Sequence, residues 1–174
     1  MRIFVPLSAV FMGVAAIMIF LSNGPEPGVL EPDARATRIE VHKREHSLSL
    51  YDGDRLLKTY RIALGFNPLG HKEREGDGRT PEGAYVIDWR NPGSAYHLSM
   101  HISYPNAEDR ARAAKKGVPP GGDIMIHGLS TGMAAVGAAH SKVDWTAGCI
   151  AVTNDEMDEI WRAVPDGTPI TITP

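Results

Sequence analysis

The sequence contains one cysteine, Cys149, among its 174 residues, so an internal disulfide is excluded. The net charge is only -3 and the pI is near 6.1, which argues against a protein that works by binding nucleic acid or an acidic membrane surface. Internal repeats and long runs of like charge are also lacking. Hydrophobic residues make up 43% of the chain and charged residues 22%, a balance typical of one packed domain with a short appendage.

The N-terminal region differs in composition from the rest of the chain. Residues 3–21 carry no charge and, as a helix, would span about 28 Å, close to the thickness of a membrane's hydrocarbon core. Residues 20–25, where this run ends, match the cleavage site of a signal peptide poorly. We therefore expect residues 1–21 to be an export segment, and we favour an uncleaved membrane anchor over a cleaved signal peptide.

The distribution of positive charge predicts the orientation of this anchor. Arg2 is the only positively charged residue before Arg35, so the positive-inside rule keeps the N-terminus in the cytoplasm. The rest of the chain then lies in the cell envelope, facing the periplasm or the wall, with residues 3–21 in the inner membrane.

Proline and glycine between residues 22 and 36 predict a linker, and a folded domain is expected over residues 37–174. Within that domain, short apolar or alternating segments predict β-strands. The strand candidates are residues 39–41, 48–50, 56–64, 84–89, 96–104, 124–126 and 170–172. A long polar loop with four glycines and two prolines separates two of them, over residues 65–82.

Two short helices complete the expected fold. Asn106 can cap a helix over residues 107–116, which has acidic residues in its first turn and lysines at its end, as the helix dipole favours. Residues 153–156 form a capping box, followed by apolar residues at helical spacing. The sequence thus predicts a mostly β fold with short helices.

Cys149 is the first candidate for catalysis. A lone cysteine is often a small buried hydrophobic residue, but an exported free thiol is a liability in an oxidising space unless it is used. A thiol becomes a nucleophile when a base or a positive field lowers its pKa, so we expect a depressed pKa and an accessible Cys149. All seven histidines precede Cys149, an order that excludes papain-like and NlpC-type peptidases.

Among the histidines, His127 is the best candidate for the base. It follows the apolar segment Ile124-Met125-Ile126, so it is expected at a strand end where a side chain can face a cleft; a purely structural histidine is the alternative. His140 is nearer to Cys149 in sequence but lies in a loop rich in glycine and alanine, with no strand to hold it. His97 and His101 could form a metal pair, but no third ligand is apparent.

Gly148 allows the backbone before Cys149 to approach a substrate closely. The backbone N–H groups of Gly148 and Cys149 could therefore stabilise an oxyanion during acyl transfer. A glycine before a cysteine is by itself a weak signal.

Three segments, residues 76–83, 126–128 and 146–150, occur in the same order as the motifs of a known family. They resemble the L,D-transpeptidase catalytic domain, also called the YkuD or ErfK domain. Ile126-His127-Gly128 and Thr146-Ala147-Gly148-Cys149-Ile150 resemble its His-Gly and Ser/Thr-His-Gly-Cys motifs, and residues 76–83 resemble its Thr-Pro-x-Gly segment. The resemblance covers residues 37–174 and implies a β-sandwich-like catalytic fold.

The resemblance also implies a reaction. Cys149 would attack the carbonyl of a meso-diaminopimelate residue in a peptidoglycan stem peptide and form an acyl-enzyme. His127 would accept the thiol proton, oriented by a backbone carbonyl such as that of Gly128. D-alanine would leave, and an amine of a second stem peptide would resolve the thioester to give a 3→3 cross-link. The family uses no metal or cofactor for this chemistry.

The sequence departs from the family pattern at three places. Ala147 replaces the signature histidine, and Ala151 stands where many members have an arginine. The interval from His127 to Cys149 is longer than usual, which indicates an inserted loop over residues 129–144 that could cover the thioester.

Other residues favour alternatives to cross-linking. Three segments, residues 103–107, 126–128 and 148–154, are more similar to the YafK-like branch, whose members include amidases that release a lipoprotein from peptidoglycan. A cysteine hydrolase of that kind is therefore the first alternative. A non-catalytic wall-binding module is the second alternative, which the retained Cys149 and His127 oppose.

Overall fold

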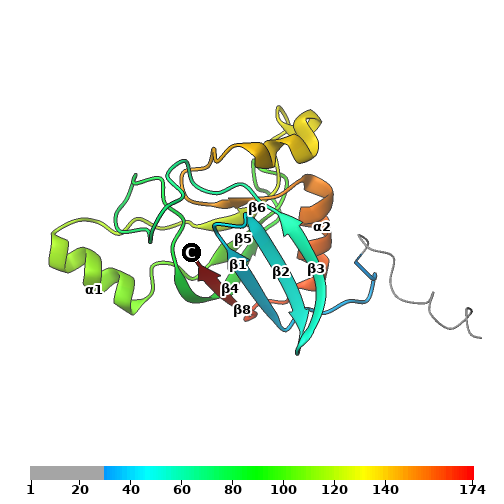
Figure 1. Cartoon of the computed structure of the whole chain (residues 1–174), viewed down its shortest axis with the longest axis horizontal. Helices are drawn as coiled ribbons and strands as arrows, with labels where there is room; N and C mark the ends of the chain where they lie inside the picture. The colour runs from blue at the N-terminus through cyan, green and yellow to red at the C-terminus, as the bar shows by residue number, and fades with distance from the viewer. Residues whose placement is uncertain (1–29) are drawn as a thin grey trace, which may run out of the picture.

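A computed structural model of the chain describes residues 30–174 (Figure 1). The expected membrane anchor, residues 1–21, and most of the expected linker lie outside these described residues. Within the described part, no helix is both long and apolar enough to cross a membrane.

The described chain is built around one curled sheet of eight strands in the order β3-β2-β1-β8-β4-β5-β6-β7. The strands are β1 (Arg38–His42), β2 (Ser47–Asp52), β3 (Arg55–Arg61), β4 (Gly83–Asn91), β5 (Ser99–Ile102), β6 (Met125–His127), β7 (Ile150–Ala151) and β8 (Pro169–Thr173). The mostly β fold predicted from the sequence is therefore confirmed.

The first and last strands pair near the centre of the sheet, and both bury alternate side chains. Ile39 and Val41 of β1 are buried, as are Ile170 and Ile172 of β8. β8 pairs in parallel with β1 and antiparallel with β4, so the C-terminal strand joins the N-terminal hairpins to the half of the sheet that contains Cys149. Burial of one apolar face specifies this register, because a slip by one residue would expose it.

Three helical segments accompany the sheet: α1 (Ala107–Lys116), the 3₁₀ segment η1 (Ala134–Lys142) and α2 (Asn154–Ala163). Asn106 and Thr153 cap α1 and α2, each in a full capping box, as the sequence predicts. α2 buries Met157 and Ile160 in the core beside β3, whereas α1 projects from the opposite side of the sheet (Figure 1).

The packed part of the chain begins before residue 37. Leu30, Ala34 and Ala36 are buried in the same core as the sheet, and the Ala36 N–H donates to the carbonyl of Ala163 at the end of α2. The strand expected over residues 96–104 is shorter and starts at Ser99, because His97 has a φ of 68°, which strand geometry does not allow.

Two buried lysines hold the long polar loop over residues 65–82 against the sheet. The Lys43 ammonium donates to the Gly70 and Thr80 carbonyls and pairs with Glu82 at 2.8 Å. Lys72 pairs with Asp77 at 3.0 Å. These hydrogen bonds and ion pairs hold the glycine-rich loop on a fixed path, and its last part lies against the turn before Cys149.

Candidate active site

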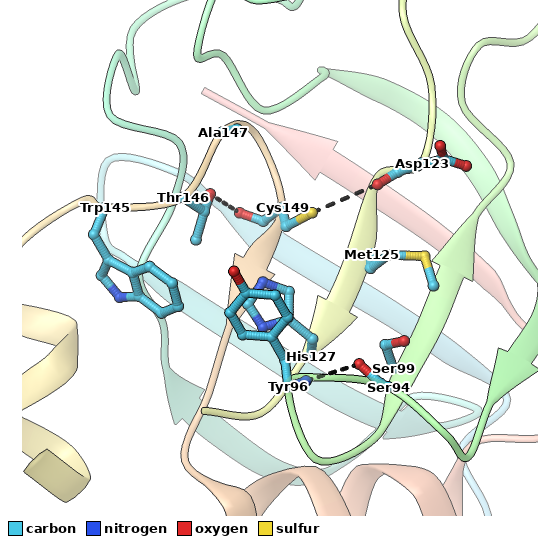
Figure 2. Close-up of a pocket in the computed structure, with 10 residues that line it drawn as sticks. All are labelled: Ser94, Tyr96, Ser99, Asp123, Met125, His127, Trp145, Thr146, Ala147 and Cys149. Carbon is cyan, nitrogen blue, oxygen red and sulfur yellow. Dashed lines mark hydrogen bonds between the residues drawn. The ribbon is translucent and has the colours of Figure 1, made fainter. Parts of the chain in front are cut away.

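Neighbouring strands bring Cys149 and His127 to one cavity. Cys149 directly precedes β7, His127 ends β6, and the two strands pair in parallel with Ile126 opposite Ile150. The cavity has a volume of about 410 Å³ (Figure 2). It is lined by Ser94, Tyr96, Ser99, Asp123, Met125, His127, Trp145, Thr146, Ala147 and Cys149.

A tight turn before β7 sets the direction of Cys149. The Thr146 hydroxyl donates to the Cys149 carbonyl at 2.7 Å and accepts from the Gly148 N–H at 3.1 Å. Gly148 has a φ of 131°, and a Cβ there would lie 2.6 Å from the carbonyl oxygen of Arg79. Only glycine fits this backbone position, which explains the residue before the cysteine.

The Cys149 thiol is half-buried and faces the cavity (Figure 2). It donates a hydrogen bond to the Asp123 carbonyl, with a Sγ–O distance of 3.6 Å. Transfer of the thiol proton to His127 therefore requires the S–H bond to turn away from this carbonyl. Such rearrangement is common, because catalytic hydrogen bonds often tighten only when the substrate is bound.

His127 is held in one orientation and one tautomer. Its Nδ1 lies 2.7 Å from the carbonyl oxygen of Gly128, so Nδ1 carries the proton and Nε2 is left as an acceptor. The Asn154 side chain at the start of α2 accepts from the Leu129 N–H at 2.7 Å, and this contact fixes the chain after Gly128. The hydrogen bond to Gly128 is the one implied by the family resemblance.

Two aromatic rings enclose the imidazole. The ring centroids of Tyr96 and His127 are 4.6 Å apart, and those of Trp145 and His127 are 5.8 Å apart. The imidazole is 4% exposed as a result. Neither aromatic residue was expected from the sequence, although Trp145 directly precedes the motif segment that begins at Thr146.

Burial changes the pKa of both candidate catalytic groups. Desolvation lowers the pKa of His127, and the hydrogen bond to Gly128 opposes this shift. Desolvation also raises the pKa of the Cys149 thiol, with smaller opposite effects from the Met125 backbone and Lys72. The depressed pKa expected for Cys149 is therefore wrong for this state, and the pair rests as a neutral thiol beside a neutral imidazole.

This neutral resting pair predicts a particular pH dependence. Acylation of Cys149 requires a neutral His127, and the pKa of His127 lies below the ordinary imidazole value of about 6.5. The acylation rate should therefore fall with decreasing pH only below about 6.5. Alkylation by iodoacetamide should rise only above about 8.5, the ordinary thiol pKa. Mass spectrometry of both adducts across pH measures these profiles, and an alkylation midpoint below the ordinary thiol value would contradict them.

The expected oxyanion donors are only partly available. The Gly148 N–H already donates to the Thr146 hydroxyl, so Gly148 contributes close approach rather than a donor. The Cys149 N–H has no backbone partner in the turns and loops of residues 30–174, and it remains the candidate donor for an oxyanion.

The other histidines lie away from the cavity lining. His140 is not in a loose loop, since it is buried within η1, where desolvation lowers its pKa. His97 pairs with Asp158 and His101 with Asp88, so the two do not form a metal pair with each other. Among residues 30–174, no group of three or more histidine, cysteine or acidic side chains is arranged to hold a metal ion.

The positions that depart from the family pattern have different surroundings. Ala147 lines the cavity, whereas Ala151 is fully buried and pairs with His127 across the strands. No residue of the expected insertion, residues 129–144, lines the described cavity, so its expected role as a cover for the thioester is not supported. Asp123 is the only acidic side chain in the lining, which contains no lysine or arginine.

Residues 36–172 match the family model of the L,D-transpeptidase catalytic domain, YkuD. The chain is 35% identical over 133 residues to YafK of Escherichia coli (strain K12), which is named as a member of the L,D-transpeptidases, and the match covers 72% of this chain and 46% of YafK. It is 33% identical over 153 residues to YkuD of Bacillus licheniformis, with 85% and 72% of the two chains covered.

Solved structures share the fold. Pgp2 from Campylobacter jejuni, described as a helical cell shape determining protein, superimposes with a TM-score of 0.60 at 26% identity, over 80% of this chain and 48% of Pgp2. An L,D-transpeptidase from Xylanimonas cellulosilytica superimposes with a TM-score of 0.53 at 15% identity, over 83% and 63% of the two chains. The chain thus spans about half the length of YafK and of Pgp2.

Proposed function

The chain belongs to the YkuD family of L,D-transpeptidase catalytic domains, and we propose that it acts on peptidoglycan through an acyl-enzyme at Cys149. The observation that carries this proposal is the placement of His127 at the end of β6 and of Cys149 just before the paired strand β7, at one cavity, with the His127 tautomer set by Gly128. A histidine with a free Nε2 that lines the same cavity as a thiol can serve as the base that nucleophilic catalysis requires.

In the proposed acylation, the Cys149 sulfur attacks the carbonyl carbon of meso-diaminopimelate in a stem peptide. His127 Nε2 takes the thiol proton as the carbon–sulfur bond forms, because both groups are neutral at rest. The Cys149 N–H stabilises the oxyanion. His127 then returns the proton to the leaving amine, D-alanine departs, and a thioester remains on Cys149.

In the proposed second step, an amine of another stem peptide attacks the thioester. His127 accepts a proton from this amine and gives it to the departing Cys149 sulfur, so the free thiol is regenerated and a 3→3 peptide bond is formed. Transfer is the favoured outcome because the chain matches L,D-transpeptidase domains over residues 36–172.

Hydrolysis of the same thioester is the second candidate, and two features of the cavity favour it. Residues 129–144 do not line the cavity, so they leave the approach of water open. The described lining also has no basic side chain to pair with the carboxylate of a leaving D-alanine. A leaving group without a neighbouring carboxylate suits such a cavity.

The proposed substrate also implies a location. Peptidoglycan lies in the cell envelope, and the uncharged run over residues 3–21 is the segment expected to bring the domain there. We infer a periplasmic or wall-facing domain held at the inner membrane by this segment.

Product analysis distinguishes transfer from hydrolysis. The full-length protein is incubated with tetrapeptide muropeptides and, separately, with lipoprotein-linked muropeptides, and the products are identified by mass spectrometry. Cross-linked dimers from the first substrate are expected, with Cys149→Ala as the inactive control. Release of the lipoprotein without dimers at any acceptor concentration would identify a hydrolase. Unchanged substrates would support a wall-binding module instead.

A further inference from the structure

A β-bulge turns Trp89 out of the core. Tyr85 and Ile87 of β4 are buried, and simple alternation would bury Trp89 as well. The pairing with β5 shifts between Ile87 and Trp89, and Trp89 is 43% exposed. Bulges next to active sites often redirect a side chain in this way, so the exposed indole is a feature of the fold rather than a loose surface residue.

Two neighbouring side chains hold the indole in place. The rings of Trp89 and His101 stack with centroids 5.2 Å apart and an interplanar angle of 20°. His101 Nδ1 donates to the Asp88 carboxylate at 2.6 Å, and Asp88 is the residue that the bulge inserts. We call Asp88, Trp89 and His101 the Trp89 shelf. Its aromatic surface is fixed before any ligand arrives.

The Trp89 shelf lies on the same face of the sheet as the catalytic pair. In the β5–β6 ladder, His101 is opposite Met125 and Ser99 is opposite His127. Met125 and Ser99 both line the cavity, whereas the intervening Met100 is buried on the other face. The shelf therefore adjoins the cavity, and β4 lies three strand spacings, or about 14 Å, from β7.

We propose that the Trp89 shelf binds a sugar ring of the glycan strand that carries the stem peptide. This inference rests on the proposed function. In a 3→3 reaction three residues separate the sugar from the attacked carbonyl, and when extended they span about 10 Å. With the short ether-linked acid that joins peptide to sugar, this length is close to the distance from Cys149 to the shelf.

The chemistry of the shelf suits a saccharide. The C–H face of a pyranose ring packs against an exposed indole, which offers a large apolar surface with little loss of side-chain entropy. The Asp88 carboxylate is part-exposed beside the indole and can accept hydrogen bonds from sugar hydroxyl groups. An exposed tryptophan alone would carry no such argument, because single exposed apolar residues are common.

A pair of donors that differ only in the sugar tests the proposal. Acylation of the full-length protein is measured with a disaccharide-linked tetrapeptide and with the free tetrapeptide. The acylation rate of the wild type should be roughly tenfold higher with the disaccharide donor, the effect expected from the free energy of one aromatic contact. Trp89→Ala should lose this preference without a lower acylation rate with the free tetrapeptide. Trp89→Phe should keep part of it. Leu56→Ala, which removes an exposed side chain on β3, should change neither rate.

Direct binding separates this proposal from the proposed function. The peptide-free disaccharide is titrated into the full-length Cys149→Ala variant while the indole N–H resonance of Trp89 is followed by NMR. A saturable shift supports the subsite even if no donor is turned over, and isothermal titration calorimetry should show weaker binding of the disaccharide once Trp89→Phe is added to the same variant. No shift, or an equal effect of Trp89→Ala on both donors, overturns it. Failure of the wild type to acylate either donor would instead reject the proposed function.

Discussion

Replacing Cys149 with alanine should abolish acyl-enzyme formation. The chain has a single thiol, and it is the strongest nucleophile among the groups that line the described cavity. A carbapenem, a β-lactam to which L,D-transpeptidase cysteines are expected to add, opens its ring on the thiol and leaves a covalent adduct. Intact-protein mass spectrometry should show this adduct on the wild type and none on Cys149→Ala.

The control for this experiment keeps the geometry of the turn. Cys149→Ser preserves the size of the side chain and the hydrogen bond from Thr146 to the backbone of residue 149. Because a hydroxyl is a much weaker nucleophile than a thiol, its adduct should form far more slowly or not at all. A full adduct on Cys149→Ala would place the nucleophile elsewhere, and peptide mapping would locate it.

Replacing His127 should slow acylation by about 10²–10⁴-fold, the usual effect of losing a general base. His127→Asn sharpens the test, because its side-chain amide can still donate to the Gly128 carbonyl that now receives Nδ1. If the slowing persists in this variant, the lost group is the Nε2 acceptor rather than the anchoring hydrogen bond. Single-turnover acylation by the same carbapenem gives the rate.

His140 provides the matched comparison. It is also a buried histidine, but it lies in η1 and does not line the cavity. His140→Ala should keep acylation within a few fold of the wild type when the rate is corrected for the folded fraction by circular dichroism. If His140→Ala shows the large loss and His127→Ala does not, the base has been assigned to the wrong histidine.

Features that depend on neighbours in the sequence could be predicted from the sequence alone. The capping boxes at Asn106 and Thr153 involve residues three apart, and both helices are present. The alternation that buries Ile39 and Val41 is likewise local. The His-Gly and Gly-Cys motifs, with their order and the Thr-Pro segment, identified the family that residues 36–172 match.

The register of the sheet decided which side chains reach the site. Alternation along β4 would bury Trp89, but the bulge opposite β5 exposes it. The sequence of β4 alone does not predict this register shift. Tyr96 and Trp145 come from two loops far apart in the sequence, and their rings contact each other and the His127 ring. Such contacts depend on long-range pairing, which sequence periodicity does not encode.

The charge state of the catalytic pair was also decided by the tertiary structure. The sequence identified Cys149 and His127 through their motifs, and those residue types predict a nucleophile and a base. Whether the thiol pKa rises or falls depends on how much water the surrounding loops and strands exclude, and here burial raises it while lowering that of His127. The sequence therefore determined which groups are available for catalysis, whereas packing determined their resting protonation, because desolvation is set by atoms distant in the chain.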